Sequence, residues 1–380
     1  MPNEKIVVFG ASGFIGASLC ERLYGEGLPF RASINSFASS ARIARLPIEI
    51  AQANVLNYQQ VREAIRGCTR VVNCAWGSEA AMVKGLGNLI RAAKEEKVQR
   101  FIHIGSISVH EGYADQDSVS EDAPPKPDGL YGRIKQRQDR MVLDLHRSGL
   151  SSMILAAGRV IGPYSSFLLR AIDRLRSGPI VLVDEGRHPS NHIHVDNLSE
   201  AVLAALRSND GWGQRYFLTE PGRPTWRAFY ADMYASLNMD FRPISVSREE
   251  VVRKTTAASP VRNYALETIR GVASAQFRQG LSAIPAFKSL NEYAYKVFTG
   301  LNPAIQGRIR AKLERPIVIS KQNRSIDLAD PFVAEQVRRT YFAPDKFITR
   351  VGYSPMLAEA EGQKLIRSWY DYAQLSDSGA

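Results

Sequence analysis

The residues of this sequence whose types and spacing could do chemistry are Tyr131, Lys135 four positions later, and Ser106, which lies 25 residues before the tyrosine. A free phenol has a pKa near ~10 and is a poor base at neutral pH. A neighbouring ammonium favours the phenolate and moves its pKa toward the working range. The serine hydroxyl would then hold a substrate hydroxyl or carbonyl in place. Together the three side chains could move a proton while a hydride leaves or arrives at the same carbon.

The tyrosine and the lysine lie in a stretch, 129–145, whose apolar residues recur at helical spacing. Because residues four apart share one face of a helix, the Tyr131 hydroxyl and the Lys135 ammonium are expected side by side. The same pattern also arises by chance, with an exposed tyrosine near a solvated lysine. Other motifs in the sequence are therefore needed to choose between the two interpretations.

A glycine-rich turn near the N-terminus predicts a dinucleotide site. The apolar run 5–9, of the kind buried in a parallel sheet, leads directly into Gly10-Ala-Ser-Gly-Phe-Ile-Gly16 and then into a helical pattern. Such glycines permit a tight turn and let a pyrophosphate approach the backbone N–H groups of a helix N-terminus. The position between a strand and a helix favours this interpretation over that of a merely structural turn.

The end of the second predicted strand bears on the choice between NAD and NADP. An acidic residue there would bind the ribose 2′-hydroxyl and mark a preference for NAD. The chain instead has Ile34, Asn35 and Ser36, with Arg42 and Arg45 a little further on. The absence of an acid and the presence of nearby guanidiniums slightly favour NADP as the expected cofactor. The two arginines could equally be ordinary charges on a helix surface.

Strand-like and helical stretches alternate through the first half of the chain. This alternation is typical of a doubly wound parallel sheet in the α/β class. Ligands of such sheets lie beyond the carboxyl ends of the strands. Gly10, Asn73 and Ser106 all follow predicted strands, so the order of the elements brings them to one edge of the sheet. After the first two strands, the predicted strands are 47–51, 70–74 and 101–104, and the predicted helices are 58–66 and 81–96.

With these elements in place, the chain resembles the extended short-chain dehydrogenase/reductase family, also called the NAD-dependent epimerase/dehydratase group. The resemblance implies a Rossmann sheet with a smaller, mostly helical C-terminal substrate lobe. It covers roughly 5–240 and is specific for the superfamily rather than for a substrate. The motifs that carry it are Gly10-Ala-Ser-Gly-Phe-Ile-Gly16, Asn73-Cys-Ala75, Ser106, Tyr131-Gly-Arg-Ile-Lys135, Gly162-Pro163 and His194-Val-Asp-Asn197.

The resemblance also implies roles for single residues. Tyr131 would be the catalytic acid/base, Lys135 would hold the nicotinamide ribose and lower the tyrosine pKa, and Ser106 would orient the reacting oxygen. The residues expected to contact an NAD(P) cofactor are Gly10, Ser12, Gly13, Phe14, Ile15, Gly16, Asn35, Arg42, Asn73, Ala75, Tyr131 and Lys135.

Departures from the family pattern bear on the reaction. Dehydratases of the family carry an Asp-Glu pair just after the Ser106 position, whereas this chain has Ile107 and Ser108, neither of which can act as that base. Ser190 stands where many sugar-nucleotide members have an arginine for the diphosphate, and Arg159 stands where they have an asparagine for the sugar. These changes argue against a 4,6-dehydratase and weaken a sugar-nucleotide function. Ser108 and Arg159 are the residues expected to contact the substrate.

Arg159 has two interpretations. A guanidinium near the nicotinamide could bind a carboxylate or phosphate of the substrate. Alternatively, Arg159 could pair with Asp184 or Glu185 in a purely structural contact. The sequence does not decide between them.

No metal site and no disulfide framework are expected. His192 and His194 share one face of a predicted strand, but no third ligand lies nearby in the sequence. The three cysteines, Cys20, Cys68 and Cys74, are too few and too scattered for a zinc site or a set of disulfides.

The function expected from these features is that of an NAD(P)-dependent oxidoreductase, which exchanges a hydride at a secondary alcohol or ketone with Tyr131 as acid/base. The first alternative is an NAD-dependent epimerase acting on sugars or nucleotide sugars. The second alternative is a non-catalytic protein that senses the cofactor. Ser106, Tyr131 and Lys135 are all intact, which argues against the second alternative.

The resemblance predicts a division of the chain into domains. The dinucleotide-binding domain would comprise 1–163, with 193–221 returning to it. The substrate lobe would comprise 164–192 and 222–380. Within that lobe lies a basic helical segment, 251–320, with eleven Lys and Arg against three acids and a net charge of +8.

The basic segment accounts for most of the net charge of +11 carried by the 380 residues. It could be a helical cap on the substrate lobe, or a basic amphipathic patch that touches an anionic membrane or admits a lipid-like substrate. No nucleic-acid module is recognisable in it, so nucleic acid is not an expected partner.

Composition and the N-terminus set the remaining expectations. Hydrophobic content of 44% and charged content of 23% are those of a globular protein. No signal peptide and no membrane span are visible, so a cytoplasmic enzyme is expected, with peripheral membrane contact left open. The expected partner is a small-molecule substrate, anionic or lipid-like. From the family resemblance we expect a homodimer that forms through the helices 81–96 and 131–146.

Overall fold

The computed structural model describes residues 4–176, 178–257, 328, 330–373 and 375. By their contacts the residues group into two units, 1–247 with 335–380, and 248–334. In the second unit, α8 (Arg248–Ala257) packs with the short helix α13 (Pro331–Ala334). Apart from the part within α8, the basic segment predicted at 251–320 lies outside the described residues. All of the predicted site residues belong to the first unit.

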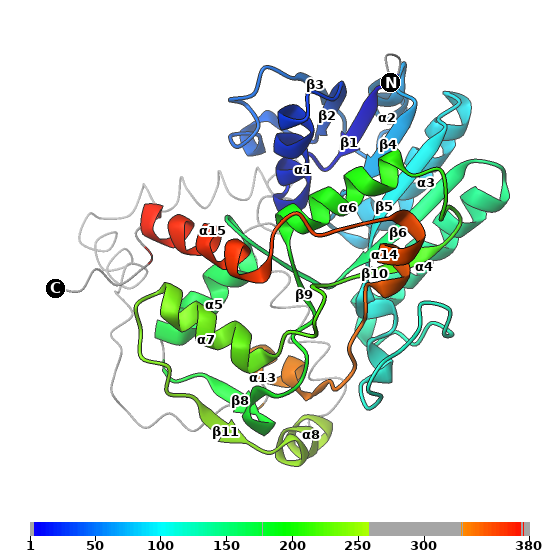
Figure 1. Cartoon of the computed structure of the whole chain (residues 1–380). Coiled ribbons are helices and arrows are strands. Elements are labelled where there is room, and N and C mark those ends of the chain that lie inside the picture. The colour runs from blue at the N-terminus through cyan, green and yellow to red at the C-terminus, as the bar shows by residue number, and fades with distance from the viewer. Residues whose placement is uncertain (1–3, 177, 258–327, 329, 374, 376–380) are drawn as a thin grey trace, which may run out of the picture. The chain divides into compact units, whose positions relative to one another are not determined.

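The first unit is built on a seven-stranded sheet in the order β10-β6-β5-β4-β1-β2-β3 (Figure 1), and every strand pair is parallel. The chain winds outward from β1 in both directions, so the strand order reverses between β1 and β4. This confirms the doubly wound α/β fold. The strands are β1 (Ile6–Phe9), β2 (Phe30–Ile34), β3 (Glu49–Gln52), β4 (Arg70–Asn73), β5 (Arg100–Ser106), β6 (Ser151–Ala157) and β10 (Arg215–Leu218).

Helices cover both faces of the sheet, which explains why its central strands are almost wholly apolar. In β1, Ile6 and Val8 face the core shared with α1 and α6, whereas Val7 and Phe9 face the core shared with α2, α3 and α4. Side chains therefore alternate between two cores along each strand. The helices are α1 (Phe14–Gly25), α2 (Tyr58–Ile65), α3 (Glu79–Glu95), α4 (Gly129–Arg147) and α6 (Val195–Arg207).

Local capping explains where several helices begin. The side chain of Ser78 accepts a hydrogen bond from the Ala81 backbone and starts α3 two residues before its predicted beginning. Asn57 and Thr225 cap α2 and α7 (Trp226–Ser236) in the same way. The predicted helices of this half of the chain are confirmed, with ends that differ by one or two residues.

Smaller elements surround the carboxyl edge of the sheet. β7 (Arg159–Ile161) pairs with β9 (His192–His194), and β8 (Val181–Val183) pairs with β11 (Ile244–Val246). The helices α5 (Ser166–Arg176), α7, α14 (Asp345–Val351) and α15 (Glu359–Tyr372) complete the unit, with α15 against α7 and α14 against β10. The separation of 164–192 and 222–380 from the sheet as a substrate lobe stays a prediction.

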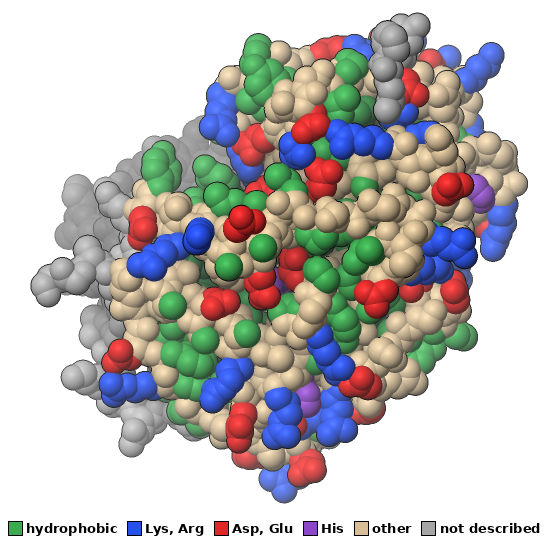
Figure 2. Space-filling model, in the orientation of Figure 1, with side chains coloured by type: hydrophobic (Ala, Val, Ile, Leu, Met, Phe, Trp, Pro, Cys, Tyr) green, Lys and Arg blue, Asp and Glu red, His purple; other side chains and the backbone are tan. Residues whose placement is uncertain are grey.

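Basic and acidic side chains are interspersed over the face shown in Figure 2. The described residues thus present both signs of charge on this face. Among the described helices, none is both long and apolar enough to cross a bilayer.

Candidate active site

The glycine turn between β1 and α1 packs directly against the end of β4. Gly10 has φ +77°, and a Cβ on it would lie 2.7 Å from the Cys74 carbonyl carbon and 2.8 Å from the Ala75 nitrogen. A side chain on Gly16 would overlap the Gly10 carbonyl group. Only glycine fits at these two positions. The turn after β1 and the turn after β4 are thereby held together at one edge of the sheet.

The first turn of α1 is free to receive an anion. Its N-cap, Gly13, offers no side-chain hydrogen bond, and no acidic residue lies in the first turn. The first backbone N–H groups of a helix lack partners within the helix and carry its positive dipole end. Ser12, Phe14 and Ile15, three of the residues expected to contact the cofactor, lie in or next to this turn. The residues present therefore fit the pyrophosphate of a dinucleotide.

Asn73, the last residue of β4, fixes the turn that follows it. Its Oδ1 accepts a hydrogen bond from the Ala75 backbone at 3.0 Å, and its Nδ2 donates to Nδ1 of His103 on β5 at 3.0 Å. Burial and the nearby Lys135 charge hold the pKa of His103 well below its ordinary value. The imidazole is thus neutral, with Nδ1 as an acceptor. Asn73 and Ala75 lie beside Gly10, as expected for cofactor-binding residues.

Ser106 and Tyr131 meet where β5 ends and α4 begins. Burial, the largest effect, and the charge of Glu111 raise the pKa of Tyr131 to about 12, although the Ser106 hydroxyl lowers it. The phenol is therefore protonated at neutral pH. Its side chain is still 43% exposed, so a substrate can reach it.

Lys135 lies one helical turn further along α4 and is buried, with 5% of its surface exposed. Its Nζ donates to the Ile104 carbonyl at 3.1 Å and lies 6.0 Å from the centre of the Tyr131 ring. Burial lowers the pKa of Lys135 to about 8. The lowering of the Tyr131 pKa that was expected from Lys135 is absent in this structure, where burial is the largest effect on that pKa and raises it. A buried ammonium with one carbonyl acceptor among the described residues fits ribose hydroxyls as further acceptors.

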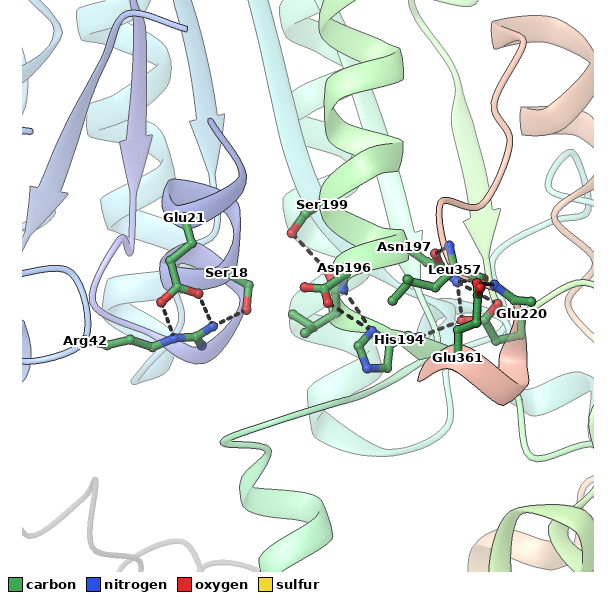
Figure 3. A network of polar contacts seen from close by, with 12 residues as sticks. Ser18, Glu21, Arg42, His194, Asp196, Asn197, Ser199, Glu220, Leu357 and Glu361 are labelled. Atoms are coloured by element: carbon green, nitrogen blue, oxygen red, sulfur yellow. Dashed lines mark hydrogen bonds and ion pairs between the residues drawn. The ribbon is translucent and has the colours of Figure 1, made fainter. Parts of the chain in front are cut away.

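A second polar network joins β9, α6 and the C-terminal segment (Figure 3). The buried carboxylate of Glu220 accepts from the His194 backbone at 2.7 Å and from Asn197 Nδ2 at 2.9 Å. Asn197 also donates to the Leu357 carbonyl at 3.0 Å and accepts from the Leu357 backbone N–H at 2.9 Å. Burial raises the pKa of Glu220. The network ties the segment before α15 to the sheet.

Arg159 pairs with neither Asp184 nor Glu185, the two partners expected for a structural contact. It forms an ion pair with Glu335, 176 residues away, and stacks 4.2 Å from the centre of the Phe167 ring. The Asp184 carboxylate instead accepts from His188 Nε2 at 3.0 Å. The expected structural partners were therefore wrong, because sequence proximity does not show how the chain returns to this place.

Three charged residues near the tyrosine were missed from the sequence. Arg338 Nη1 lies 3.3 Å from Glu111 Oε1, and Glu335 holds Arg159. Burial, the largest effect, raises the pKa of Glu111, Arg338 and Arg159 lower it, and Glu335 raises it. Two guanidiniums and three carboxylates, with Asp128 3.5 Å from Arg338 as the third, thus act on one another, and Glu111 among them acts on Tyr131. Glu111 lies five residues after Ser106 and could have been noticed, whereas Glu335 and Arg338 give no signal in the sequence.

Three further residues were predicted to contact the substrate or the cofactor: Ser108, Asn35 and Arg42. The Ser108 backbone donates to Ser106 Oγ at 3.2 Å, and its own hydroxyl is buried without a partner among the described residues. Asn35 is exposed at the end of β2. Arg42 lies against α1, where its Nη2 donates to Ser18 Oγ at 2.9 Å.

Comparison with known proteins extends these observations. The family model described as NAD dependent epimerase/dehydratase family matches residues 6–217. A 4-hydroxy-2-methyl-3-oxo-4-farnesyl-3,4-dihydroquinoline-1-oxide ketoreductase from Stigmatella aurantiaca is 26% identical over 240 residues, which are 59% of this chain and 71% of that protein. A 2-alkyl-3-oxoalkanoate reductase from Shewanella oneidensis is 29% identical over 221 residues, 52% of this chain and only 56% of that protein. The human sterol-4-alpha-carboxylate 3-dehydrogenase, decarboxylating, is 24% identical over 257 residues, 62% of this chain and 68% of that protein.

Among solved structures, DesIV, a dTDP-glucose 4,6-dehydratase from Streptomyces venezuelae crystallised with NAD, superposes with a TM-score of 0.65. The match covers 97% of this chain and 98% of that chain at 17% identity. At this identity the likeness shows the fold alone.

Proposed function

This chain belongs to the NAD-dependent epimerase/dehydratase family, and from that premise we propose that it is an NAD(P)-dependent reductase or dehydrogenase that interconverts a 3-oxo and a 3-hydroxy carboxylic acid. The observation that carries the proposal is that β5, which ends at Ser106, packs against α4, which carries Tyr131 and Lys135 in its first turns. Two guanidiniums, those of Arg159 and Arg338, act on the nearby Glu111.

Tyr131, Ser106 and Lys135 have separate roles in the proposed carbonyl reduction. Bound NAD(P)H supplies the hydride that the carbonyl carbon receives. Tyr131, whose pKa of about 12 keeps it protonated at neutral pH, donates its proton to the carbonyl oxygen, which Ser106 holds by a hydrogen bond. In the direction of oxidation, the phenolate takes the proton back. Lys135 binds the nicotinamide ribose and, when charged, stabilises that phenolate.

The charged cluster supports an anionic substrate. Arg159 and Arg338 each carry a guanidinium that pairs with carboxylates in this structure: Arg159 with Glu335, and Arg338 with Glu111 and Asp128. A substrate carboxylate has the same chemistry as these partners and would bind a guanidinium in the same planar way by displacing one of them. In addition, the matched Shewanella protein is named for a 2-alkyl-3-oxoalkanoate and the human one for a sterol-4-alpha-carboxylate. A lipid-like acid is therefore the substrate class that we favour.

The glycine turn, the free first turn of α1 and the turn fixed by Asn73 are the places proposed to hold the cofactor. Gly10, Gly13 and Gly16 shape the pyrophosphate site, and Ala75 lies next to it. The choice between NADP and NAD stays a prediction: the absence of an acid after β2 favours NADP, whereas Arg42, the nearby guanidinium, is already paired with Glu21. A homodimer and a peripheral contact with membranes stay predictions.

The proposal is tested with the purified full chain, NADPH or NADH, and a panel of 2-alkyl-3-oxoalkanoates, their methyl esters, and nucleotide sugars. We expect consumption of the reduced cofactor with the free acids and a higher Michaelis constant for the esters, which lack the carboxylate. Interconversion of nucleotide sugars with no net change in cofactor would instead establish the alternative, an epimerase. Equal turnover of acids and esters would remove the carboxylate from the proposal.

A further inference from the structure

Arg42 lies where the adenosine end of a dinucleotide is expected. The loop that carries it follows β2, and the ribose 2′ position lies beside the end of that strand in this fold. Its Nη1 donates to the Phe14 carbonyl at 3.3 Å and its Nη2 to Ser18 Oγ at 2.9 Å, so the guanidinium rests on the first turns of α1. In addition, Ser39 Oγ donates to Ser12 Oγ of the glycine turn at 3.2 Å. The loop after β2 is thus joined to the pyrophosphate site.

The carboxylate of Glu21 on α1 binds both arginines of this loop, and Figure 3 shows its pair with Arg42. Arg42 Nε donates to Glu21 Oε1 at 3.1 Å and Arg42 Nη2 to Glu21 Oε2 at 2.5 Å. Arg45 Nη2 donates to Glu21 Oε1 at 2.7 Å. Paired charge-assisted bonds of this kind are the strong ones.

Few hydrogen-bond donors of the Arg42 guanidinium remain available to a ligand. A guanidinium has five N–H donors. With Glu21, Ser18 and Phe14 as acceptors, four of the five are used. One face of the guanidinium is also covered by the Tyr164 ring, whose centre lies 4.7 Å away. A phosphate can bind Arg42 only by displacing the Glu21 carboxylate.

We propose that Glu21 sets the preference of this protein between NAD(H) and NADP(H), because its carboxylate occupies the guanidinium edge of Arg42 that a 2′-phosphate needs and also binds one N–H group of the exposed Arg45. The inference rests on the proposed use of a nicotinamide dinucleotide and assigns its specificity to a residue on α1. No acid follows β2, so the discrimination comes from competition for the arginines. NAD(H), which has no 2′-phosphate, leaves the ion pairs intact.

The test is the direct measurement of dissociation constants for NADH and NADPH with the full chain, by nicotinamide fluorescence or calorimetry. Glu21→Gln removes the charge but keeps the size of the side chain. We expect this variant to improve the affinity for NADPH relative to NADH on the order of tenfold, as for one charged hydrogen bond. Glu26→Gln is the matched control, because Glu26 also lies at α1 but pairs with Arg22 and Arg207. It makes the same change in net charge and should leave the ratio unchanged.

A second pair of variants makes the result decisive. In an Arg42→Met, Arg45→Met background, the change Glu21→Gln should no longer alter the NADPH-to-NADH ratio. A ratio unmoved by Glu21→Gln in the otherwise native chain would overturn the inference, and so would a shift that persists without both arginines. Should the wild type bind neither dinucleotide, the proposed function and this inference fail together. Should it bind both while the ratio stays fixed, only the role of Glu21 fails.

Discussion

Asn73 on β4 donates from Nδ2 to Nδ1 of His103 on β5 at 3.0 Å, and both side chains are buried. The two residues are paired in register in the sheet. This hydrogen bond fixes which way the Asn73 amide points, and its Oδ1 then accepts from the Ala75 backbone. A neutral histidine thus orients the turn that packs against Gly10.

Replacing the histidine tests this relationship. His103→Leu leaves the Asn73 amide buried without its acceptor, and we expect it to lower the free energy of unfolding by about 1–3 kcal/mol. It should also weaken NADH binding, because the turn at Ala75 loses its support. Urea unfolding and a binding titration measure the two effects. His103→Gln, which keeps an acceptor, should be milder in both, and equal behaviour of the two variants would contradict the assigned role.

The close contact at Gly10 gives a second prediction. Gly10→Ala places a methyl group 2.7 Å from the Cys74 carbonyl carbon at φ +77°, so the two turns must move apart. We expect a marked loss of dinucleotide binding and a lower melting temperature. Gly25→Ala is the control, because no atom lies within 4 Å of its added methyl group and alanine favours helix. If both variants bound NADH as the wild type does, the close packing of the two turns would not matter for the cofactor.

The buried Lys135 gives the stability a specific dependence on pH. Its pKa falls from 10.5 to about 8 on folding, so between these values the unfolded chain binds more protons than the folded one. Stability therefore rises with pH above about 8, at up to about 1.4 kcal/mol per pH unit from this group. Without cofactor, the free energy of unfolding of the wild type should gain about 1 kcal/mol between about pH 8.5 and about pH 9.5 relative to Lys135→Met. Parallel curves for the two proteins would show that the lysine keeps its ordinary pKa.

The variant Arg159→Ala distinguishes a role of this arginine in substrate binding from a purely structural role. We expect Arg159→Ala to raise the Michaelis constant for a 3-oxo acid on the order of tenfold or more, since a charged hydrogen bond is lost, with little change in turnover number. The exposed Arg170 provides the control, as Arg170→Ala makes the same change of charge on α5. A lowered melting temperature with an unchanged Michaelis constant would mean that Arg159 serves only to hold Glu335.

The sheet and the helices around it could be predicted because their signals are local. Continuous apolar runs mark strands covered on both faces, and the glycine turn between a strand and a helix marks the dinucleotide end. The order of strands then placed Gly10, Asn73 and Ser106 at one edge.

What the sequence could not predict depends on burial and on distant segments. Spacing put Lys135 beside Tyr131, but not the burial that raises the pKa of the phenol and directs the ammonium to the Ile104 carbonyl. Likewise, nothing in the neighbourhood of Arg159 indicates that Glu335 returns to it. Long-range ion pairs of this kind follow from the tertiary fold rather than from a pattern in the chain.

The most direct measurement of the central claim is deuterium transfer to a 3-oxo acid from NADPH or NADH that carries two deuterium atoms at the nicotinamide C4, for the wild type and Tyr131→Phe. We predict one deuterium per molecule of hydroxy acid with the wild type. For the variant we predict a rate lowered by about 100- to 10,000-fold, with cofactor affinity unchanged. Wild-type rates in the variant, or a hydroxy product that carries no deuterium, would contradict the assignment of Tyr131 as the acid of a hydride-transfer enzyme.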